Sequence, residues 1–188
     1  MADRKTNTSA PASYAPGQSS PKPAIRSDLF ARLAELSIVT ETVEHPPVFT
    51  VAESDSVERK VPGGHTKNLF LKDTKGALFL VVAESHTPVD LKALSRRLGA
   101  GRFSFGKPEL LMEVLGITPG SVTVFALMND TAGRVQIVMD ERLMRHEVIN
   151  AHPLDNAATT SIARQDLFRF ISACGHTPRI AVLVSEEA

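Results

Sequence analysis

Two runs of strand-forming residues, 66–72 and 77–83, lie on either side of the short segment Asp73-Thr74-Lys75-Gly76. That segment has the chemistry of a tight turn, so the pattern predicts a β-hairpin, and the apolar character of both runs predicts two central strands of a sheet. Gly63 and Gly64 directly precede the hairpin, so a loop with free choice of backbone angles leads into the first strand. The remaining elements must pack around this hairpin.

The first strand of the hairpin carries a lysine among apolar residues. Side chains alternate along a strand, so Lys67 should share a face with Leu69 and Leu71, while Asn68 lies on the other face. An ammonium in apolar surroundings costs on the order of several kcal/mol unless a group accepts its protons. Two interpretations are open: Lys67 reaches water from the open end of the strand, or it receives an anionic or carbonyl ligand.

The composition indicates one domain without a strong electric field. The chain has 188 residues, 43% hydrophobic and 22% charged, which is enough for a sizeable core. Lysine plus arginine equals aspartate plus glutamate at 21 each, so contact with nucleic acid must be local and modest. The single cysteine, Cys174, excludes an internal disulfide and fits a reducing compartment. No apolar run approaches the ~20 residues of a membrane span, and we expect a cytoplasmic protein without membrane contact.

Residues 1–25 are rich in small and polar residues and are predicted to form a disordered tail, which leaves 26–188 as the domain. The predicted helices are 27–36 with Ser27 as N-cap, 50–59 behind a Thr50–Glu53 capping box, 91–98 capped by Asp90, 109–115 opened by Pro108, and 166–174. Beyond the hairpin, the predicted strands are 40–44, 103–105, 122–127, 134–139, 147–150, 159–162 and 180–184. The strands and helices do not alternate strictly as βαβ units, and hairpins occur. The sequence therefore predicts a mixed sheet and the α+β class.

Three polar loops abut predicted strand ends, where pockets tend to form: 63–68, 116–121 and 150–156. The Gly-Ile-Thr-Pro-Gly turn that begins at Gly116 could bind a carbonyl, a carboxylate or an oxyanion through its backbone N–H groups, or it could be an ordinary turn. His152 could be a surface residue that caps a carbonyl, or it could act in a site. The histidines lack the spacing of a zinc site and there is no nucleotide-binding motif, so we expect no metal and no cofactor.

Four segments together resemble the YbaK/ProX family of prolyl-tRNA editing domains, in order and spacing from about Ser27 to Val184. They are Lys67 to Asp73, Leu98 to Gly106, Leu115 to Thr123, and His152 to Asn156. The chain looks most like the free-standing alanyl-tRNA(Pro) deacylases of this family. The resemblance implies an enzyme with a single domain, in which helices surround a curved, largely antiparallel mixed sheet. Its reaction would be hydrolysis of a wrongly charged amino acid from tRNA(Pro).

The resemblance also implies roles for individual residues. The catalytic residues are then Lys67, Asn68 and His152, and the substrate-binding residues are Gly116, Ile117, Thr118, Pro119, Gly120 and Ser121. Lys67 and backbone N–H groups would stabilise the ester carbonyl oxygen as charge develops, and water, helped by the ribose hydroxyl, would attack. Mischarged tRNA(Pro) is the implied partner, and the neutral charge agrees with a transient, modest affinity for tRNA. Prolyl-tRNA synthetase or an elongation factor could contact the protein transiently to deliver the substrate.

The choice of amino acid rests on the family alone. A missing methylene is worth only ~1–3 kcal/mol, so a synthetase for proline cannot fully reject the smaller alanine, and a second sieve is needed. The sequence leaves cysteine and serine open as alternatives. It also leaves open a binding module of the same fold that senses an amino acid or aminoacyl-nucleotide without hydrolysis, although the costly position of Lys67 argues against that interpretation.

Overall fold

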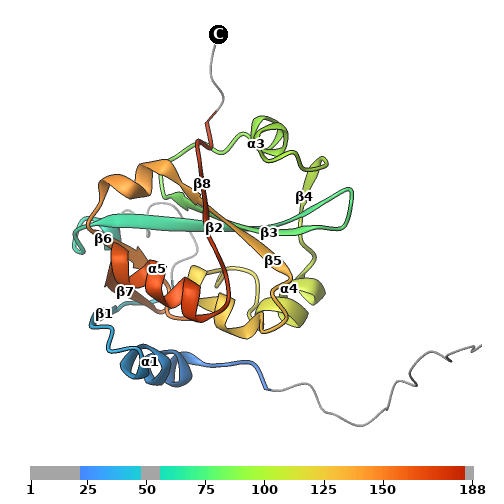
Figure 1. The fold of residues 1–188 in the computed structure, drawn as a ribbon. Helices are drawn as coiled ribbons and strands as arrows, with labels where there is room; N and C mark the ends of the chain where they lie inside the picture. Colours follow the sequence, from blue (N-terminus) through green and yellow to red (C-terminus); the bar gives the residue numbers. More distant parts are fainter. Residues whose placement is uncertain (1–21, 48–55, 185–188) are drawn as a thin grey trace, which may run out of the picture.

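The computed structural model describes residues 22–47 and 56–184. Most of the predicted tail and the Thr50–Glu53 capping box therefore lie outside the described residues. One eight-stranded sheet has the order β1-β7-β6-β2-β3-β5-β8, with β4 paired to β2 beside this path. The β2–β3 hairpin crosses the middle of the molecule, with α3 above it and α4 below it in the view of Figure 1. The prediction of an α+β domain built around this hairpin is confirmed.

The strands are β1 (Thr40–Glu44), β2 (Gly64–Asp73), β3 (Leu78–Glu84), β4 (Phe103–Phe105), β5 (Val135–Asp140), β6 (Val148–Ala151), β7 (Ala158–Ala163) and β8 (Arg179–Ala181). The α-helices are α1 (Arg26–Glu35), α3 (Leu91–Leu98), α4 (Pro108–Leu115) and α5 (Arg164–Ala173), and the 3-10 helices are η1 (Val124–Asn129) and η2 (Glu141–Arg145). The pairs β1–β7, β2–β3, β2–β4 and β6–β7 are antiparallel, whereas β2–β6, β3–β5 and β5–β8 are parallel. The sheet is mixed, as predicted.

The hairpin turn is held by a buried carboxylate. The side chain of Asp73 accepts the backbone N–H groups of Lys75, Ala77 and Gly101, each at 2.9 Å. These hydrogen bonds, led by that of Gly101, lower the pKa of Asp73 although burial opposes them. Gly76 occupies the left-handed region with φ 88, as a tight turn requires. Asp73 therefore ties the turn to the segment that leads into β4.

The two faces of the hairpin pack into two different apolar cores. Phe70 and Leu80 belong to the larger core, which also contains residues of α1, α4, η1 and α5. Leu71 and Phe79 belong to a smaller core that contains Leu94 of α3. Lys67 lies opposite Ala83, a member of the smaller core. The prediction that Lys67 shares the face of Leu69 and Leu71 is therefore confirmed.

The predicted strand 122–127 is wrong, because residues 124–127 belong to the 3-10 helix η1. The hydroxyl of Thr123 accepts the backbone N–H of Phe125 at 3.3 Å, and this turn begins the helix. Residues 124–127 are all fully buried. A short run that is buried on every side carries no periodicity that distinguishes a strand from a helix.

Two element ends also differ from the prediction. Ser27 is not the N-cap of α1, because the helix already begins at Arg26, and the backbone N–H of Ile25 is satisfied by the Asp28 side chain at 2.8 Å. The last strand ends at Ala181, before the predicted end at Val184. The caps of α3 agree with the prediction, with Asp90 at its start and a left-handed Gly99 at its end.

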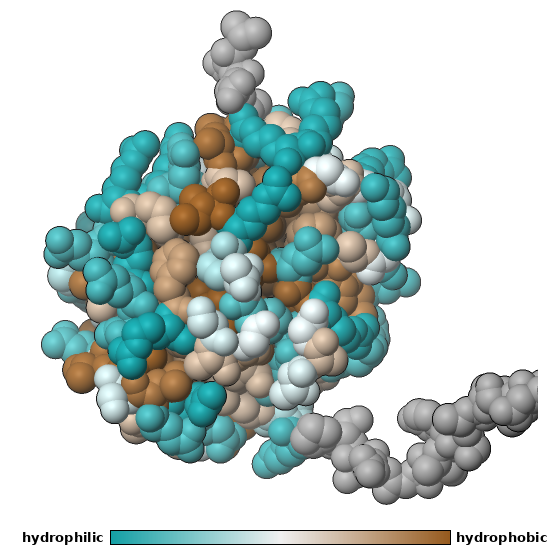
Figure 2. Space-filling view, viewed as in Figure 1, coloured by the Kyte–Doolittle hydropathy of each residue, from teal (hydrophilic) through white to brown (hydrophobic). Residues whose placement is uncertain are grey.

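Polar and apolar side chains are interspersed over the visible surface of the molecule (Figure 2). The formal net charge of the sequence is +0, so neither sign of charge predominates. Among the helices of residues 22–47 and 56–184, none is long and apolar enough to cross a membrane.

Candidate active site

Strand β2 changes its neighbour along one of its two edges. It pairs with β6 at Gly64 and His65 and with β4 from Leu71 to Asp73. Between these two partners, residues 66–70 have no strand partner on this edge within the described part of the chain. We call residues 66–69 the open edge of β2, because the Phe70 carbonyl on this edge is paired with the N–H of Gly106. The open edge lies in the middle of a central strand, where the backbone groups of a sheet are normally paired.

The open edge presents the backbone of Asn68. The carbonyl of His65 accepts the N–H of Ser85 at 2.8 Å, so the backbone N–H and C=O groups of the odd-numbered residues of β2 point toward β3. The backbone groups of the even-numbered residues point toward the opposite edge, and accordingly the carbonyl of Phe70 accepts the N–H of Gly106 at 2.9 Å. The backbone N–H and C=O of Asn68 therefore point into the open edge. An N–H in such a place can bind a carbonyl oxygen or a developing oxyanion.

The side chains of Lys67 and Asn68 leave the open edge on opposite faces of the sheet. Lys67 is half-buried, and none of the described residues forms a hydrogen bond or an ion pair with it. The Oδ1 atom of Asn68 is buried without a hydrogen-bond partner among the described residues, and its Nδ2 lies 3.5 Å from Thr66 Oγ1. A buried polar group without a partner costs about 1–3 kcal/mol. Both side chains thus retain hydrogen-bonding capacity for a ligand.

A small pocket with histidine walls lies where β6 adjoins the open edge. Its volume is about 30 Å³, and its lining residues are His45, Val57, Glu58, His65, Thr66, Asn150, Ala151, His152 and Thr159. His65 and Asn150 are register partners of β2 and β6, so they project from one face of the sheet, which is also the face of Lys67. The pocket therefore opens on the Lys67 side of the sheet.

Each of these three histidines donates a ring N–H to a backbone carbonyl. The contacts are His45 Nδ1 to Pro46 at 2.8 Å, His65 Nε2 to Val61 at 2.7 Å, and His152 Nδ1 to Ala158 at 3.0 Å. A carbonyl oxygen can only accept, so these nitrogens carry the protons. The Nε2 atom of His45 then accepts the hydroxyl of Thr159 at 3.0 Å. By contrast, Nε2 of His152 has no hydrogen-bond partner among residues 22–47 and 56–184.

The surroundings of His152 favour its neutral form. Burial lowers the pKa of His152 below the usual value, and the Ala158 carbonyl and the Asp155 carboxylate only partly oppose this effect. His45 lowers the pKa further, and the centroids of the two rings are 6.3 Å apart. A neutral ring that donates from Nδ1 has its lone pair on Nε2. That atom is suited to accept a hydrogen bond or a proton.

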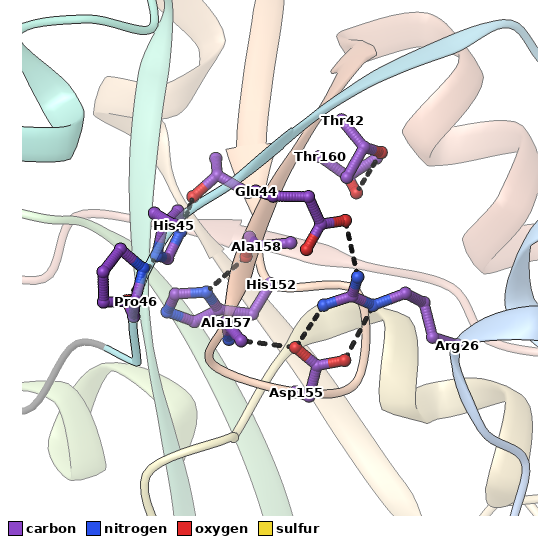
Figure 3. A network of polar contacts seen from close by, with 11 residues as sticks. Arg26, Thr42, Glu44, His45, Pro46, His152, Asp155, Ala157, Ala158 and Thr160 are labelled. Carbon is purple, nitrogen blue, oxygen red and sulfur yellow. Dashed lines mark hydrogen bonds and ion pairs between the residues drawn. The ribbon is translucent and has the colours of Figure 1, made fainter.

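The loop that carries His152 is held from a distant part of the chain. Asp155 accepts the backbone N–H of Ala157 at 2.9 Å and two N–H groups of Arg26 in α1, from Nε at 2.7 Å and from Nη2 at 2.5 Å. Figure 3 shows the Arg26 guanidinium between Asp155 and Glu44. Although burial opposes the effect, the hydrogen bonds from Arg26 and Ala157 lower the pKa of Asp155. The carboxylate is therefore ionised at neutral pH.

The glycine-bearing loop lies on the other side of the sheet. Gly116 ends α4 with φ 64, and the N–H of Ser121 donates to the carbonyl of Thr118 at 3.1 Å. Ile117 packs in the larger core, on the same side as Phe70 and the Asn68 side chain. Residues 116–118 line a hollow of about 350 Å³ together with Met112, Leu154, Asp155 and residues 23–27. The 152–156 loop therefore borders both this hollow and the histidine pocket.

The structure brings the sequence-predicted residues together only in part. His152 lines the histidine pocket, Lys67 projects from the same face of the sheet, and the Asn68 backbone lies in the open edge. Gly116, Ile117 and Thr118 line the second hollow, whereas Pro119 and Gly120 are exposed and Ser121 is half-buried. The catalytic and binding roles of all these residues remain predictions.

Sequence reasoning did not assign a role to His45, His65, Asn150 or Thr159, which complete the pocket. The only local signals were a His-Pro pair at residue 45 and a histidine directly after Gly64. Within the described ranges, no three His, Cys, Asp or Glu side chains are arranged to hold a metal ion. Each of the three pocket histidines instead uses one ring nitrogen to donate a hydrogen bond to a backbone carbonyl.

Comparison with known proteins identifies the family of this chain. A sequence model of the aminoacyl-tRNA editing domain matches residues 45–170. A protein of Danio rerio named prolyl-tRNA synthetase associated domain-containing protein 1 is 42% identical over 158 residues, covering 83% of this chain and 86% of that protein. The prolyl-tRNA editing protein ProX of Acetoanaerobium sticklandii is 35% identical over 150 residues, covering 79% of this chain and 92% of that protein.

Solved structures share the fold. The crystal structure of a trans-editing enzyme for prolyl-tRNA synthetase superimposes with a TM-score of 0.64 at 19% sequence identity, covering 90% of this chain and 100% of that chain. Members of the editing-domain family are aminoacyl-tRNA deacylases, which hydrolyse the ester between an amino acid and tRNA. The resemblance noted in the sequence is confirmed, and the chain belongs to the aminoacyl-tRNA editing domain family, of the YbaK/ProX type.

Proposed function

We propose that this protein hydrolyses alanyl-tRNA(Pro), releasing alanine and tRNA(Pro). The observation that supports this proposal most directly is the open edge of β2, where the Asn68 backbone N–H, the Lys67 side chain and the histidine pocket adjoin one another. Family membership supplies the reaction class, and ProX is the relative whose name includes prolyl-tRNA editing. The proposal extends that class to one substrate and to named residues.

In the proposed reaction, the ester carbonyl lies against the open edge. The Asn68 N–H and the Lys67 ammonium donate to the carbonyl oxygen as negative charge develops on it. Water attacks the carbonyl carbon, oriented by the free hydroxyl of the terminal ribose, and Nε2 of His152 accepts its proton. The bond from the carbonyl carbon to the ribose oxygen then breaks, and that oxygen takes up the proton to restore the terminal hydroxyl of tRNA.

We assign the aminoacyl group to the Asn68 side chain and the 116–121 loop. The buried Oδ1 of Asn68 accepts a hydrogen bond from the α-ammonium group of the substrate, which would satisfy an atom that has no partner in residues 22–47 and 56–184. The loop limits the space for the side chain, so that a methyl group fits and the larger pyrrolidine ring of proline is rejected by overlap. Overlap with a rigid wall discriminates more strongly than the ~1–3 kcal/mol of one missing methylene.

The decisive experiment compares substrates and variants in parallel. Purified protein is incubated with alanyl-, cysteinyl-, seryl- and prolyl-tRNA(Pro), and ester loss is followed against spontaneous hydrolysis. We expect fast loss of alanine, little loss of proline, and strong impairment by Lys67→Ala. Lys72→Ala is the matched control, because Lys72 lies on the same strand but is exposed at its far end.

Each other result would contradict a defined part of the proposal. Faster loss of cysteine or serine would overturn the choice of alanine while leaving the chemistry intact. Absence of hydrolysis for all four substrates would overturn the deacylase function for tRNA(Pro).

The same proposal places the protein in the cytoplasm with only transient contact to prolyl-tRNA synthetase or an elongation factor, because the substrate is free mischarged tRNA.

A further inference from the structure

Arg26 joins two segments that each carry a pocket histidine. Its Nε and Nη2 atoms donate to the two carboxylate oxygens of Asp155, three residues after His152, and its Nη1 donates to Glu44 at 2.6 Å, directly before His45. A guanidinium that binds both oxygens of a carboxylate fixes its orientation as well as its position. One side chain from α1 thus connects the end of β1 with the 152–156 loop (Figure 3).

The 152–156 loop needs such an external support. Leu154 has a left-handed backbone with φ 72, which is strained for a residue other than glycine. Its N–H donates to the carbonyl of His152 at 3.0 Å, so the strained turn directly shapes the backbone of that histidine. Strain of this kind persists only where surrounding contacts hold it. Two features supply these contacts: the hydrogen bonds from Arg26 to the adjacent Asp155, and the burial of the Leu154 side chain.

The ion pair between Arg26 and Asp155 is partly shielded from water. The Arg26 side chain is 26% exposed and that of Asp155 is 42% exposed, whereas that of Glu44 is 68% exposed. The two carboxylates raise the pKa of Arg26, so it remains a cation at every working pH. Of the two contacts, the bidentate one to Asp155 should therefore carry most of the effect.

We propose that Arg26 is a positioning residue, which holds the 152–156 loop and the end of β1 so that His152 and His45 keep their places in the pocket. Arg26 lies before residue 45, where the match to the editing-domain sequence model begins. The support for the pocket therefore comes from a helix outside the matched region. The catalytic part of this inference rests on the proposed deacylase function, but the structural part can be measured without any substrate.

The first test is nuclear magnetic resonance of histidine labelled with ¹⁵N, which reports the proton on each ring nitrogen. In the wild type, His152 should show a proton on Nδ1 alone. In Arg26→Ala it should exchange between both tautomers, and its pKa should rise because Asp155 then acts on it without a neutralising cation. The groups that face His152 are His45, His65, Asp155 and, across the pocket, Glu58. Arg32→Ala is the control, from the same helix and with its own ion pair to Glu35.

The second test is single-turnover hydrolysis of alanyl-tRNA(Pro). We expect Arg26→Ala to lower the rate about 10-fold with the affinity for tRNA changed less than about 2-fold, and Arg32→Ala to match the wild type. Arg26→Lys keeps the positive charge but cannot bind both oxygens of Asp155 in the same way. Its rate should therefore lie between those of Arg26→Ala and the wild type. It also replaces Arg26→Ala should that variant fail to fold.

The outcomes separate this inference from the proposed function. If the wild type cleaves the ester and Arg26→Ala leaves both the rate and the His152 signals unchanged, the positioning role is refuted. If the wild type cleaves no ester but His152 changes its tautomer in Arg26→Ala, the structural link stands and the proposed deacylase function fails. An equal loss of rate in Arg32→Ala would also overturn the inference, since the effect would then belong to α1 as a whole.

Discussion

His45 and His152 meet edge to face across the pocket, with ring centroids 6.3 Å apart and an angle of 61° between the ring planes. Both rings donate from Nδ1 to a backbone carbonyl, but only His45 also uses Nε2 within the described part of the protein, toward Thr159. The two histidines therefore differ in what they offer to a substrate. His45 lines the pocket with both ring nitrogens engaged, whereas His152 presents the lone pair of Nε2 to a substrate.

Replacing His152 by asparagine separates the roles of its two ring nitrogens. The amide introduced by His152→Asn can still donate toward Ala158, but it has no atom at the position of Nε2. We expect this variant to keep the Tm of the wild type within a few degrees, while kcat falls about 10²–10⁴-fold, the usual contribution of a proton acceptor. Thermal unfolding and steady-state hydrolysis of alanyl-tRNA(Pro) measure the two effects. Activity close to that of the wild type would exclude His152 as the proton acceptor.

The lowered pKa of His152 predicts the pH dependence of the reaction. The neutral ring is required, so kcat/KM should be level above about pH 6.5, the ordinary pKa of histidine, and should fall only at lower pH. Stability should move in the same direction. Below about pH 6.5 the unfolded chain binds a proton that the folded protein resists, so the free energy of unfolding decreases with falling pH. Denaturant titrations at two pH values, repeated with His152→Asn, would reveal this contribution as a difference between the two proteins.

Lys67 should be important for activity and unimportant for stability. It has no partner among the described residues, so Lys67→Met removes the charge without leaving another group unpaired. We expect kcat/KM to decrease about 10–100-fold, in line with the ~1.5–3 kcal/mol of a hydrogen bond to a charged group, and the free energy of unfolding to be unchanged or higher. The same substitution at Lys72, exposed on the same strand, should alter neither quantity.

Asn68 offers a sharper separation of activity and stability. Its Oδ1 is buried and has no hydrogen-bond partner within the described ranges, and its side chain lies on the face of Phe70 in the larger core. Asn68→Leu fills a similar volume with apolar atoms and should raise the free energy of unfolding by about 1 kcal/mol. Hydrolysis of alanyl-tRNA(Pro) should nevertheless fall at least about 10-fold. A variant that is both less stable and fully active would disprove the assignment of Asn68 to the substrate.

Gly63 should tolerate no side chain. It has φ 121, and a Cβ atom there would lie 2.9 Å from Asn150 Nδ2 and 2.9 Å from the carbonyl of Val148. We expect Gly63→Ala to cost about 1–3 kcal/mol of stability, measured by urea denaturation. Since Asn150 lines the histidine pocket, activity should fall as well. Gly133→Ala is the control, because it has a left-handed backbone with φ 63 but nothing within 4 Å of the added atom.

Local patterns in the sequence predicted much of the fold and some of the site. The period of two along 66–72 correctly placed Lys67 with Leu69 and Leu71, and the caps at Asp90 and Gly99 correctly marked the ends of α3. Such signals can be read locally because they depend on neighbours a few residues apart. The prediction of a strand at 122–127 failed because residues 123–127 are fully buried, and a run that is buried on every side has no periodicity.

By itself the sequence determined the hairpin, the face of Lys67 and, through four motifs in order, the family. The tertiary structure alone decided how the site is built. The open edge of β2 exists because β6 and β4, which are far apart in the chain, pair with its two ends and, in the described part of the chain, leave its middle without a strand partner. Likewise, Arg26 and Asp155 are 129 residues apart, and no local pattern indicates their contact. Contacts of this kind depend on how distant elements pack, which the spacing of residues along the chain does not encode.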